Sequence, residues 1–339
     1  MLTVLVWWLW IQIIGLAALP LAHHFFRRLP DRGYTFARPL GLLLTTYVLW
    51  MGGSLGLLRN SIGGALFSIL AVAAVSLIIY RRGRSESDPG LLRWLRDNGR
   101  LVLSVELLFL GALALWSLVR AYSPDLTTAG GEKFMEIMYL NSIGRSEYFP
   151  PLDAWLSGYA ISYYYFGYVM IALLARLSGL AAHLIFNVGV ALLFALTCTG
   201  GFGLVYNLVK GARDVDTAQD EEEDEAEPAR PARPIAWGFL GAILVAVLGN
   251  LQGFLEVLYS SQLLPFGFWQ WLDIKDINQP IDPSVAASLV PTRSGWWWWR
   301  ASRVIHDLDP LGNSMGVQPI DEFPGFSFLL GDMHPHVLA

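Results

Sequence analysis

Cysteine is almost absent from the sequence, with Cys198 as the single example among 339 residues. The chain can therefore form no internal disulfide and no cysteine-based metal cluster. Charged residues are also scarce: they make up 15% of the chain, whereas soluble globular domains average about 25%. Hydrophobic residues account for 54%, and the mean hydropathy is +0.46. This composition predicts an integral membrane protein.

Several signatures of soluble enzymes are missing as well. The sequence contains no Walker motif, no G-x-S-x-G nucleophile motif and no glycine-rich dinucleotide-binding loop. The formal net charge of −5 is modest, so it gives no reason to expect a nucleic-acid partner. Soluble-type nucleotide chemistry and nucleic-acid binding are therefore set aside.

The sequence does contain a series of long apolar segments. A spanning helix needs about 20 mostly apolar residues. Six segments are close to this length: 2–21, 40–58, 62–80, 101–119, 184–208 and 235–259. The first lacks the basic start and the cleavage site of a signal peptide, so we expect it to be retained as a span. The fold predicted is an all-α, polytopic transmembrane helical bundle.

The distribution of arginine predicts which loops face the cytoplasm. Loops 22–39 and 81–100 are short and rich in arginine, as cytoplasmic loops usually are. Basic residues at both ends of loop 210–234 favour the same side. Alternation of the spans then places two large loops, 120–183 and 260–339, outside. We predict a multi-pass protein of the cytoplasmic (inner) membrane with large extracytoplasmic loops.

One apolar stretch is too short for a span. It follows three consecutive tyrosines, Tyr163, Tyr164 and Tyr165, and is interrupted by Arg176. A run of about 13 apolar residues suits an interfacial or re-entrant helix better than a crossing. We expect this segment to lie against the outer membrane surface, in contact with membrane lipids.

Two glutamates stand out in the first outside loop. Glu132 and Glu136 are four residues apart after a Gly-Gly pair, so they share one face if a helix begins there. Two carboxylates on one face could supply a general base or hold a divalent cation. A solvated helix face is the alternative reading of the same spacing.

The second outside loop ends in a D-x-H-x-H motif formed by Asp332, His334 and His336. Pro335 argues against a regular helix at this point, and an extended chain would place the three side chains on one side. Such a group could hold a metal ion, or it could be a satisfied polar cluster beside the membrane. A divalent cation is therefore a candidate cofactor, and the motif does not identify which metal it would be.

Three long motifs resemble the YYY membrane protein family of bacteria and archaea, a family of unknown function. They are "GEKFMEIMYLNSIGRSEYFPPLDAWLSGYAISYYYFGY", "WWWWRASRVI" and "IDEFPGFSFLLGDMHPHVLA". The resemblance covers residues 101–339. Members of that family usually continue for many more spans, so we expect this chain to be the N-terminal part of a longer protein.

The order of segments also resembles the GT-C membrane glycosyltransferases. In those enzymes a span leads to an outside loop with an early acidic motif, then an amphipathic helix, two more spans and a second acidic residue. The resemblance implies a GT-C-like fold and a polyprenyl-phosphate-linked sugar donor used on the extracytoplasmic face. The adjacent Asp-Glu pair of the mannosyltransferases is missing here, because Glu132 and Glu136 are four residues apart.

This resemblance implies a role for each candidate residue. Catalysis would involve Asp332 and either Glu132 or Glu136 as the base for an acceptor hydroxyl. The remaining candidates would bind substrate, with the two arginines neutralising the donor phosphate: Arg145, Tyr163, Tyr164, Tyr165, Arg300, His334 and His336.

The sequence predicts two domains and is compatible with three functional classes. Residues 1–100 are predicted to form a three-span accessory bundle, and residues 101–339 the GT-C-like membrane domain. The alternatives to glycosyl transfer are a transporter or lipid flippase and a non-catalytic membrane scaffold. Intramembrane charges would favour transport, and Glu106 and Glu256 are the clear acidic candidates within the apolar segments.

Overall fold

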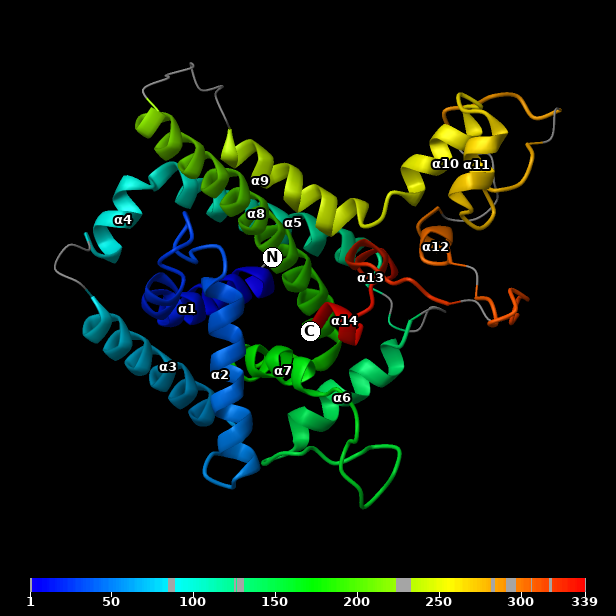
Figure 1. Ribbon diagram of the computed structural model, residues 1–339. Helices are drawn as coiled ribbons and strands as arrows, with labels where there is room; N and C mark the ends of the chain where they lie inside the picture. The colour runs from blue at the N-terminus through cyan, green and yellow to red at the C-terminus, as the bar shows by residue number, and fades with distance from the viewer. Residues whose placement is uncertain are drawn as a thin grey trace.

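The computed structural model describes residues 2–84, 89–124, 126, 131–223, 233–281, 284–290, 297–305, 307–316 and 319–338. Within these ranges every regular element is a helix, and β-structure is limited to two isolated bridges. The predicted all-helical class is therefore confirmed. The α-helices, labelled in Figure 1, are α1 (Leu2–Phe25), α2 (Ala37–Ser54), α3 (Ile62–Gly83), α4 (Leu91–Asp97), α5 (Gly99–Tyr122), α6 (Lys133–Arg145), α7 (Phe166–Ser178), α8 (Ala182–Glu223), α9 (Pro234–Ile243), α10 (Gln252–Ser260), α11 (Phe266–Leu272), α12 (Trp297–Ala301), α13 (Pro324–Leu330) and α14 (Pro335–Leu338). A short π-helix, η1 (Leu244–Leu248), directly follows α9.

Four helices in the described part of the chain are long and apolar enough to cross a membrane. They are α1, α3, α5 and the apolar part of α8, Ala182–Asp214. These four correspond to expected spans, and each is an uninterrupted apolar helix of at least 22 residues. The expected total of six spans is not reached, because the segments 40–58 and 235–259 behave differently.

The segment 40–58 forms α2, which is shorter and more polar than expected. The helix starts at Ala37, so it includes Arg38, and it ends at Ser54. The backbone N–H groups of Leu57 and Leu58 both donate to the carbonyl of Gly52. This turn stops the helix before Leu58, and α2 is not among the four candidate spans.

The segment 235–259 is bent rather than straight. Helices α9 and η1 are separated from α10 by a short break, and the two parts differ in direction by 78°. Gly249 lies in the break with φ +60°, a conformation that favours glycine. Counted together, the parts make a fifth, broken span or a re-entrant loop.

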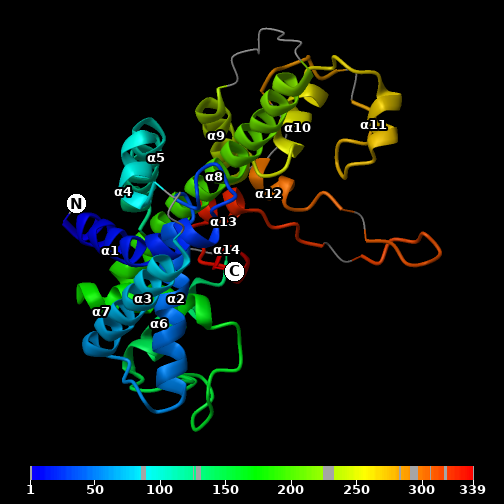
Figure 2. The same cartoon turned by 60° about the vertical axis from the view of Figure 1, so that its left-hand side comes forward.

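Helices α1, α2 and α3 pack together and contact the rest of the bundle through α5, α7 and α8. Figures 1 and 2 show α5, α8 and α9 side by side along another edge of the molecule. The boundary at residue 100 stays a prediction. An ion pair crosses it, because Arg38 of α2 contacts Glu106 of α5.

Helix α7 holds a central position. Its 13 residues are too few to span a membrane, as expected, and Arg176 lies in its last turn. It packs against α1, α2, α3, α6, α8 and α14, so that most of its side chains from Tyr168 to Leu174 are buried. The helix is thus enclosed by protein on most sides, and its orientation to a membrane surface stays a prediction.

Candidate functional site

The structure brings Glu136 and Asp332 together, although 196 positions separate them in the sequence. Glu136 lies in the first turn of α6, and Asp332 follows the short helix α13. Both side chains are buried. Two carboxyl groups removed from water and placed against each other cannot both remain charged without a large cost. We refer to Glu132, Glu136, Asp332 and His334 as the acidic cluster.

Backbone groups fix the position of this pair. The N–H of Met333 donates to Glu136 Oε2 at 3.0 Å, and the N–H of Glu132 donates to Asp332 Oδ2 at 3.3 Å. The N–H of Asp332 donates to the carbonyl of Ser327, which closes the turn after α13. Each carboxylate is therefore held by the backbone of the segment that carries the other.

Glycine is required where the two segments meet. Gly131 has φ +72°, and a Cβ atom at this position would lie 2.5 Å from Asp332 Oδ2. Gly331 has φ +70°, and a Cβ atom there would overlap the guanidinium of Arg120, which itself donates to Asn187 Oδ1 at 2.7 and 2.9 Å. The second glycine of the Gly-Gly pair therefore allows the close approach of α6 to Asp332.

Burial determines the protonation of Glu136. Burial is the largest of the effects that raise the pKa of this carboxyl to about 10, and the hydrogen bond to Asp332 and the charge of Asp332 add to it. The hydrogen bond from the N–H of Met333 acts in the opposite direction and lowers the pKa. At neutral pH Glu136 therefore keeps its proton. Asp332 Oδ1 is buried and accepts no N–H or hydroxyl hydrogen bond within the described residues. The Glu136 proton is the donor available to it.

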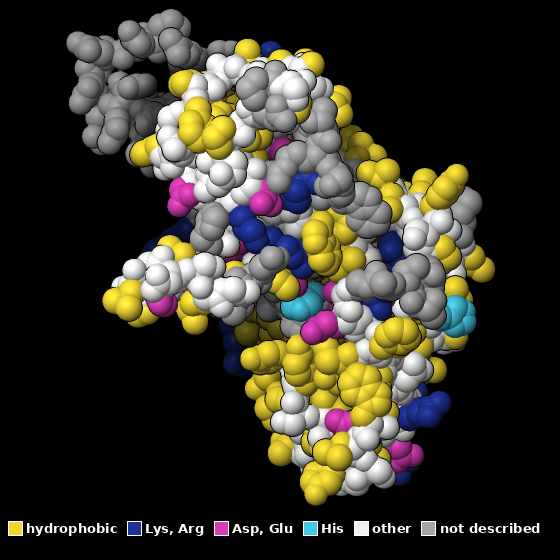
Figure 3. Space-filling view, turned by 90° about the vertical axis from the view of Figure 1, so that its right-hand side faces the viewer, with side chains coloured by type: hydrophobic (Ala, Val, Ile, Leu, Met, Phe, Trp, Pro, Cys, Tyr) yellow, Lys and Arg dark blue, Asp and Glu magenta, His cyan; other side chains and the backbone are white. Residues whose placement is uncertain are grey.

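The accessible part of the cluster is formed by Glu132 and His334. The Glu132 side chain is 43% exposed, and its Oε2 lies 3.7 Å from His334 Nε2. The other ring nitrogen, Nδ1, lies 2.9 Å from Oε2 of Glu322. His334 therefore stands between two carboxylates at the mouth of the buried pair. Figure 3 shows histidine, acidic and basic side chains gathered in the middle of this face, above an extended hydrophobic area.

Tyrosines line one side of the cluster. The Tyr168 hydroxyl lies 3.5 Å from Glu136 Oε1, and burial together with the charge of Glu136 raises the pKa of Tyr168. The ring of Tyr139 lies between those of Tyr168 and Tyr163, with centroid distances of 5.2 and 5.6 Å. Burial raises the pKa of Tyr163, and the charge of Glu132 adds to this effect.

The three consecutive tyrosines have different environments. Tyr163 stacks at the edge of the cluster, whereas Tyr164 is 76% exposed and contacts it only through Tyr163. Tyr165 turns away, because its hydroxyl accepts a hydrogen bond of 2.9 Å from Trp50 Nε1. Of the triplet, Tyr163 is therefore the member next to the carboxyl groups.

Of the two predicted phosphate-binding arginines, one is ion-paired and the other lies at the far end of α6. Arg300 forms an ion pair of 2.6 Å with the buried carboxylate of Glu256. Arg145 is exposed at the C-terminal end of α6, nine residues after Glu136, which corresponds to about 13 Å of helix. Glu106 is also ion-paired, with Arg38. The acidic residues that would favour transport are thus both neutralised by arginine.

The D-x-H-x-H motif is only partly extended. Residues 332–334 have no helical structure, but α14 begins at Pro335 and includes His336. The expectation that proline opposes a helix here is wrong, because proline is well tolerated in the first helical position. The side chain of His336 lies outside the part that the structure describes. Among the described side chains, no group of three or more His, Cys, Asp or Glu could hold a metal ion.

Sequence reasoning missed Glu322 and Tyr168. Glu322 belongs to the IDEFPG stretch, where it follows another acidic residue, Asp321. Nothing in this local sequence distinguishes Glu322 from Asp321. Tyr168 lies three residues beyond Tyr165. Residues three apart share one face of a helix, so helical spacing from the triplet could have identified Tyr168. The burial of Glu136 could not be predicted from the spacing of the glutamates, because it depends on the segment after α13, which is distant in the sequence.

These features define a polytopic helical membrane protein with a buried carboxyl pair beside short apolar helices. A family model described as "Uncharacterized membrane protein (DUF2298)" matches residues 44–339. The chain therefore belongs to this family of membrane proteins, for which the description assigns no activity. No curated protein matches the chain. No solved structure matches it either, so the likeness to GT-C enzymes stays a prediction.

Proposed function

We propose that the acidic cluster is the site of a glycosyl transfer from a polyprenyl-phosphate-linked sugar to an acceptor hydroxyl at the membrane surface. The observation that carries the proposal is the buried contact between Glu136 and Asp332, with Glu132 and His334 at its mouth. Carboxyl groups with separated pKa values in one site are typical of acid–base catalysis.

The structure supports a division of roles among the carboxyl groups. Glu136 is buried and keeps its proton at neutral pH, so it is suited to hold Asp332 rather than to accept a proton. Glu132 is exposed and lies at the mouth, so it can reach an acceptor hydroxyl. We therefore assign Glu132 as the general base and Glu136 as a positioning residue. Asp332, held by Glu136 and by the backbone N–H of Glu132, is assigned to the donor side of the site.

The proposed reaction is a direct displacement at the anomeric carbon. A bond forms between the acceptor oxygen and this carbon, and the bond from the carbon to the phosphate oxygen breaks. The acceptor proton passes to Glu132, and the electron pair leaves with the polyprenyl phosphate. His334 lies beside Glu132 and Glu322, where its ring can orient the base. No group of three or more His, Cys, Asp or Glu side chains among the described residues lies together in a way that could hold a metal ion, so no step is routed through a divalent cation.

The substrate-binding side of the proposal rests on Tyr163 and on exposed hydrophobic surface. The Tyr163 ring is partly exposed beside the cluster and could pack against a sugar ring. Figure 3 shows an extended hydrophobic area below a group of histidine and acidic side chains, and a prenyl chain could lie along such a surface. Arg145 is distant from the cluster and Arg300 is already paired, so neither is assigned to the reacting phosphate in this proposal.

Radiolabelled polyprenyl-phosphate sugars offer a direct test. The full chain in lipid nanodiscs would be incubated with these donors and with membrane extracts as acceptors. Glu132→Gln is expected to lower turnover by about 10²–10⁴-fold, as is typical for loss of a general base. Asp97→Asn on α4 is the control, because it removes an exposed carboxylate remote from the site in sequence. Equal turnover by E132Q and the wild type would overturn the assignment.

A further inference from the structure

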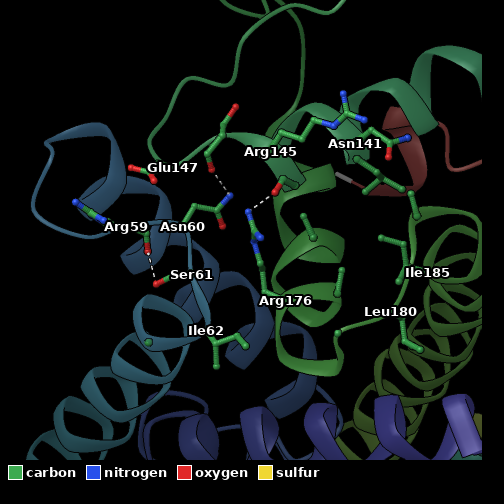
Figure 4. Close-up of a pocket in the computed structure, with 18 residues that line it drawn as sticks. Arg59, Asn60, Ser61, Ile62, Asn141, Arg145, Glu147, Arg176, Leu180 and Ile185 are labelled. Carbon is green, nitrogen blue, oxygen red and sulfur yellow. Dashed lines mark hydrogen bonds between the residues drawn. The ribbon is translucent and has the colours of Figure 1, made fainter.

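A cleft lies at the other end of α6, away from the acidic cluster. It is an open cleft of about 900 Å³ between the α2–α3 turn, the C-terminal half of α6, the end of α7 and the start of α8. None of the acidic cluster residues lines it. Figure 4 shows Arg176 in the centre of this cleft, with Arg59 to its left and Arg145 above it.

Arg176 is the central charge of the cleft, and no carboxylate in the described chain is paired with it. Its Nη2 donates to the carbonyl of Gly144, while its Nε is buried and has no hydrogen-bond partner among the described residues. Burial lowers the pKa of Arg176, and no acidic group raises it. A partly buried guanidinium without a counter-ion is costly unless an anion neutralises it.

The other charges of the cleft leave a positive excess. Arg145 lines the rim, and no described carboxylate pairs with it. Arg59 is held by the Tyr148 hydroxyl and lies near Glu147, which is the acidic residue of the lining. Three arginines against one glutamate favour an anionic ligand, and guanidinium groups match the oxygens of a phosphate especially well.

The location of the cleft points to the membrane surface. Candidate spans α3 and α8 begin at Ile62 and Ala182, and both residues line the cleft. The positive ends of two helix dipoles therefore meet there. The wall toward the spans is apolar, with Leu140, Leu180 and Ile185 among its residues. A charged centre at the ends of spans and an apolar wall along them are what an amphiphile in the bilayer would contact.

We propose that this cleft binds a membrane lipid with an anionic phosphate head group. The phosphate pairs with Arg176 and is approached by Arg145, and the hydrocarbon chain lies along the apolar wall between α3 and α8. The proposal does not depend on glycosyl transfer, because it uses neither the acidic cluster nor a reacting sugar.

Native mass spectrometry can measure this binding on the full chain. The protein, purified in a neutral detergent, would be titrated with phosphatidylglycerol and, separately, with phosphatidylcholine. We expect one phosphatidylglycerol to be retained preferentially. Arg176→Gln should weaken its binding by about tenfold or more, the typical effect of losing a hydrogen bond to a charged group. Arg145→Gln should weaken it less, because its side chain is at the rim.

The control is Arg93→Gln, which removes the same charge from an exposed position on α4. It should leave retention unchanged. Because Arg145 is exposed, the R145Q variant is expected to fold. It therefore tests the proposal even if the R176Q variant fails to fold. Equal retention by R145Q, R93Q and the wild type would overturn the proposal. Displacement of the lipid by millimolar inorganic phosphate, with equal affinity for the free anion, would also overturn it, because the site would then be specific for phosphate and not for a lipid.

Discussion

The backbone of Gly131 lies directly against the carboxylate of Asp332. A Cβ atom at residue 131 would be 2.5 Å from Asp332 Oδ2, and the residue has φ +72°. Two independent features thus require glycine here, the left-handed backbone and the absence of space. The contact joins the start of α6 to the segment after α13, so it assembles the acidic cluster.

Replacing this glycine should separate the two halves of the cluster. We expect Gly131→Ala to lower thermal stability in detergent and to abolish activity, because the methyl group displaces Asp332. Gly158→Ala is a matched control: Gly158 also has a positive φ, +87°, but a Cβ atom there meets no other atom within 4 Å. The control should show only the cost of backbone strain, about 1–2 kcal/mol. Equal effects of the two changes would argue against the contact with Asp332.

The raised pKa of Glu136 predicts an unusual pH dependence of stability. Its pKa is about 10 in the folded protein and about 4.3 in an unfolded chain. Between these values the folded state holds one more proton than the unfolded state. Stability therefore decreases as pH rises through this window, by up to about 1.4 kcal/mol for each pH unit.

Glu136→Gln should remove this pH dependence, because the amide is neutral at every pH and can still donate to Asp332. We expect the E136Q variant to be at least as stable as the wild type at pH 8–9, measured by thermal unfolding in detergent across a pH series. Tyr168→Phe keeps the carboxyl and loses only a weak contact of 3.5 Å, so it should retain the wild-type slope. A slope unchanged in E136Q would mean that another group causes it.

The ion pair between Arg38 and Glu106 should make a measurable contribution to stability. Arg38 is buried, also donates to Gln12 Oε1 and lies 4.4 Å from the centre of the Phe109 ring. Breaking a buried pair from one side costs about 3–5 kcal/mol. The Glu106 side chain is 31% exposed, so we expect Arg38→Met to cost about 3 kcal/mol, the lower end of that range.

A double variant tests the pairing itself. Adding Glu106→Gln to R38M should recover part of the loss, because the unpaired carboxylate is removed. The exposed pair of Arg93 and Asp97, at 3.7 Å, is the matched control, and breaking it should cost about 1 kcal/mol or less. Unfolding by denaturant in detergent would measure both pairs. Additive losses in the double variant would show that the two residues do not interact.

The sidedness of the chain can be checked with single cysteines. Cys198 is buried, so the background reaction with a thiol reagent should be low. Ser157 is exposed before α7, and Asp214 is exposed at the end of the apolar part of α8. We expect Ser157→Cys to react with an impermeant maleimide in intact cells and Asp214→Cys to react only after permeabilisation. Reaction of D214C from outside would reverse the orientation inferred from the arginine-rich loops.

The parts of the fold that the sequence predicts are those controlled by local composition. Four apolar segments without interruption correspond to α1, α3, α5 and the apolar part of α8. The segments 40–58 and 235–259 differ from the expected straight spans, because apolar length alone does not show where a helix ends or bends. In the first, Arg38 is part of the helix and Gly52 closes a turn. In the second, Gly249 allows a bend of 78°.

The candidate site depended on information that spacing alone does not contain. Helical periodicity places Glu132 and Glu136 on one face, but it cannot show that Glu136 is buried and Glu132 exposed. That difference arises because the segment after α13 binds the carboxylate of Glu136 through the N–H of Met333, whereas it leaves the Glu132 side chain 43% exposed. Glu322 also becomes visible only when the chain folds and brings it to His334. The approach of Asp332 to the glutamates was expected from a resemblance, and spacing could not have suggested it.

The bend between η1 and α10 affects which part of the chain can change in length. Phe323 packs against Gly249, and Gly325 of α13 lies against the carbonyl of Val247, so the chain leaves and returns at the same place. The part in between, which carries α10, α11 and α12, stands to one side of the bundle in Figure 1. It is a closed appendage, with its own internal contacts such as Asn250 to Ala301. Doubling the length of a flexible loop costs only about 0.6 kcal/mol. Because the two ends of residues 250–321 meet beside Gly249, we expect a longer or shorter exposed connection within this part to leave Asp332 in place.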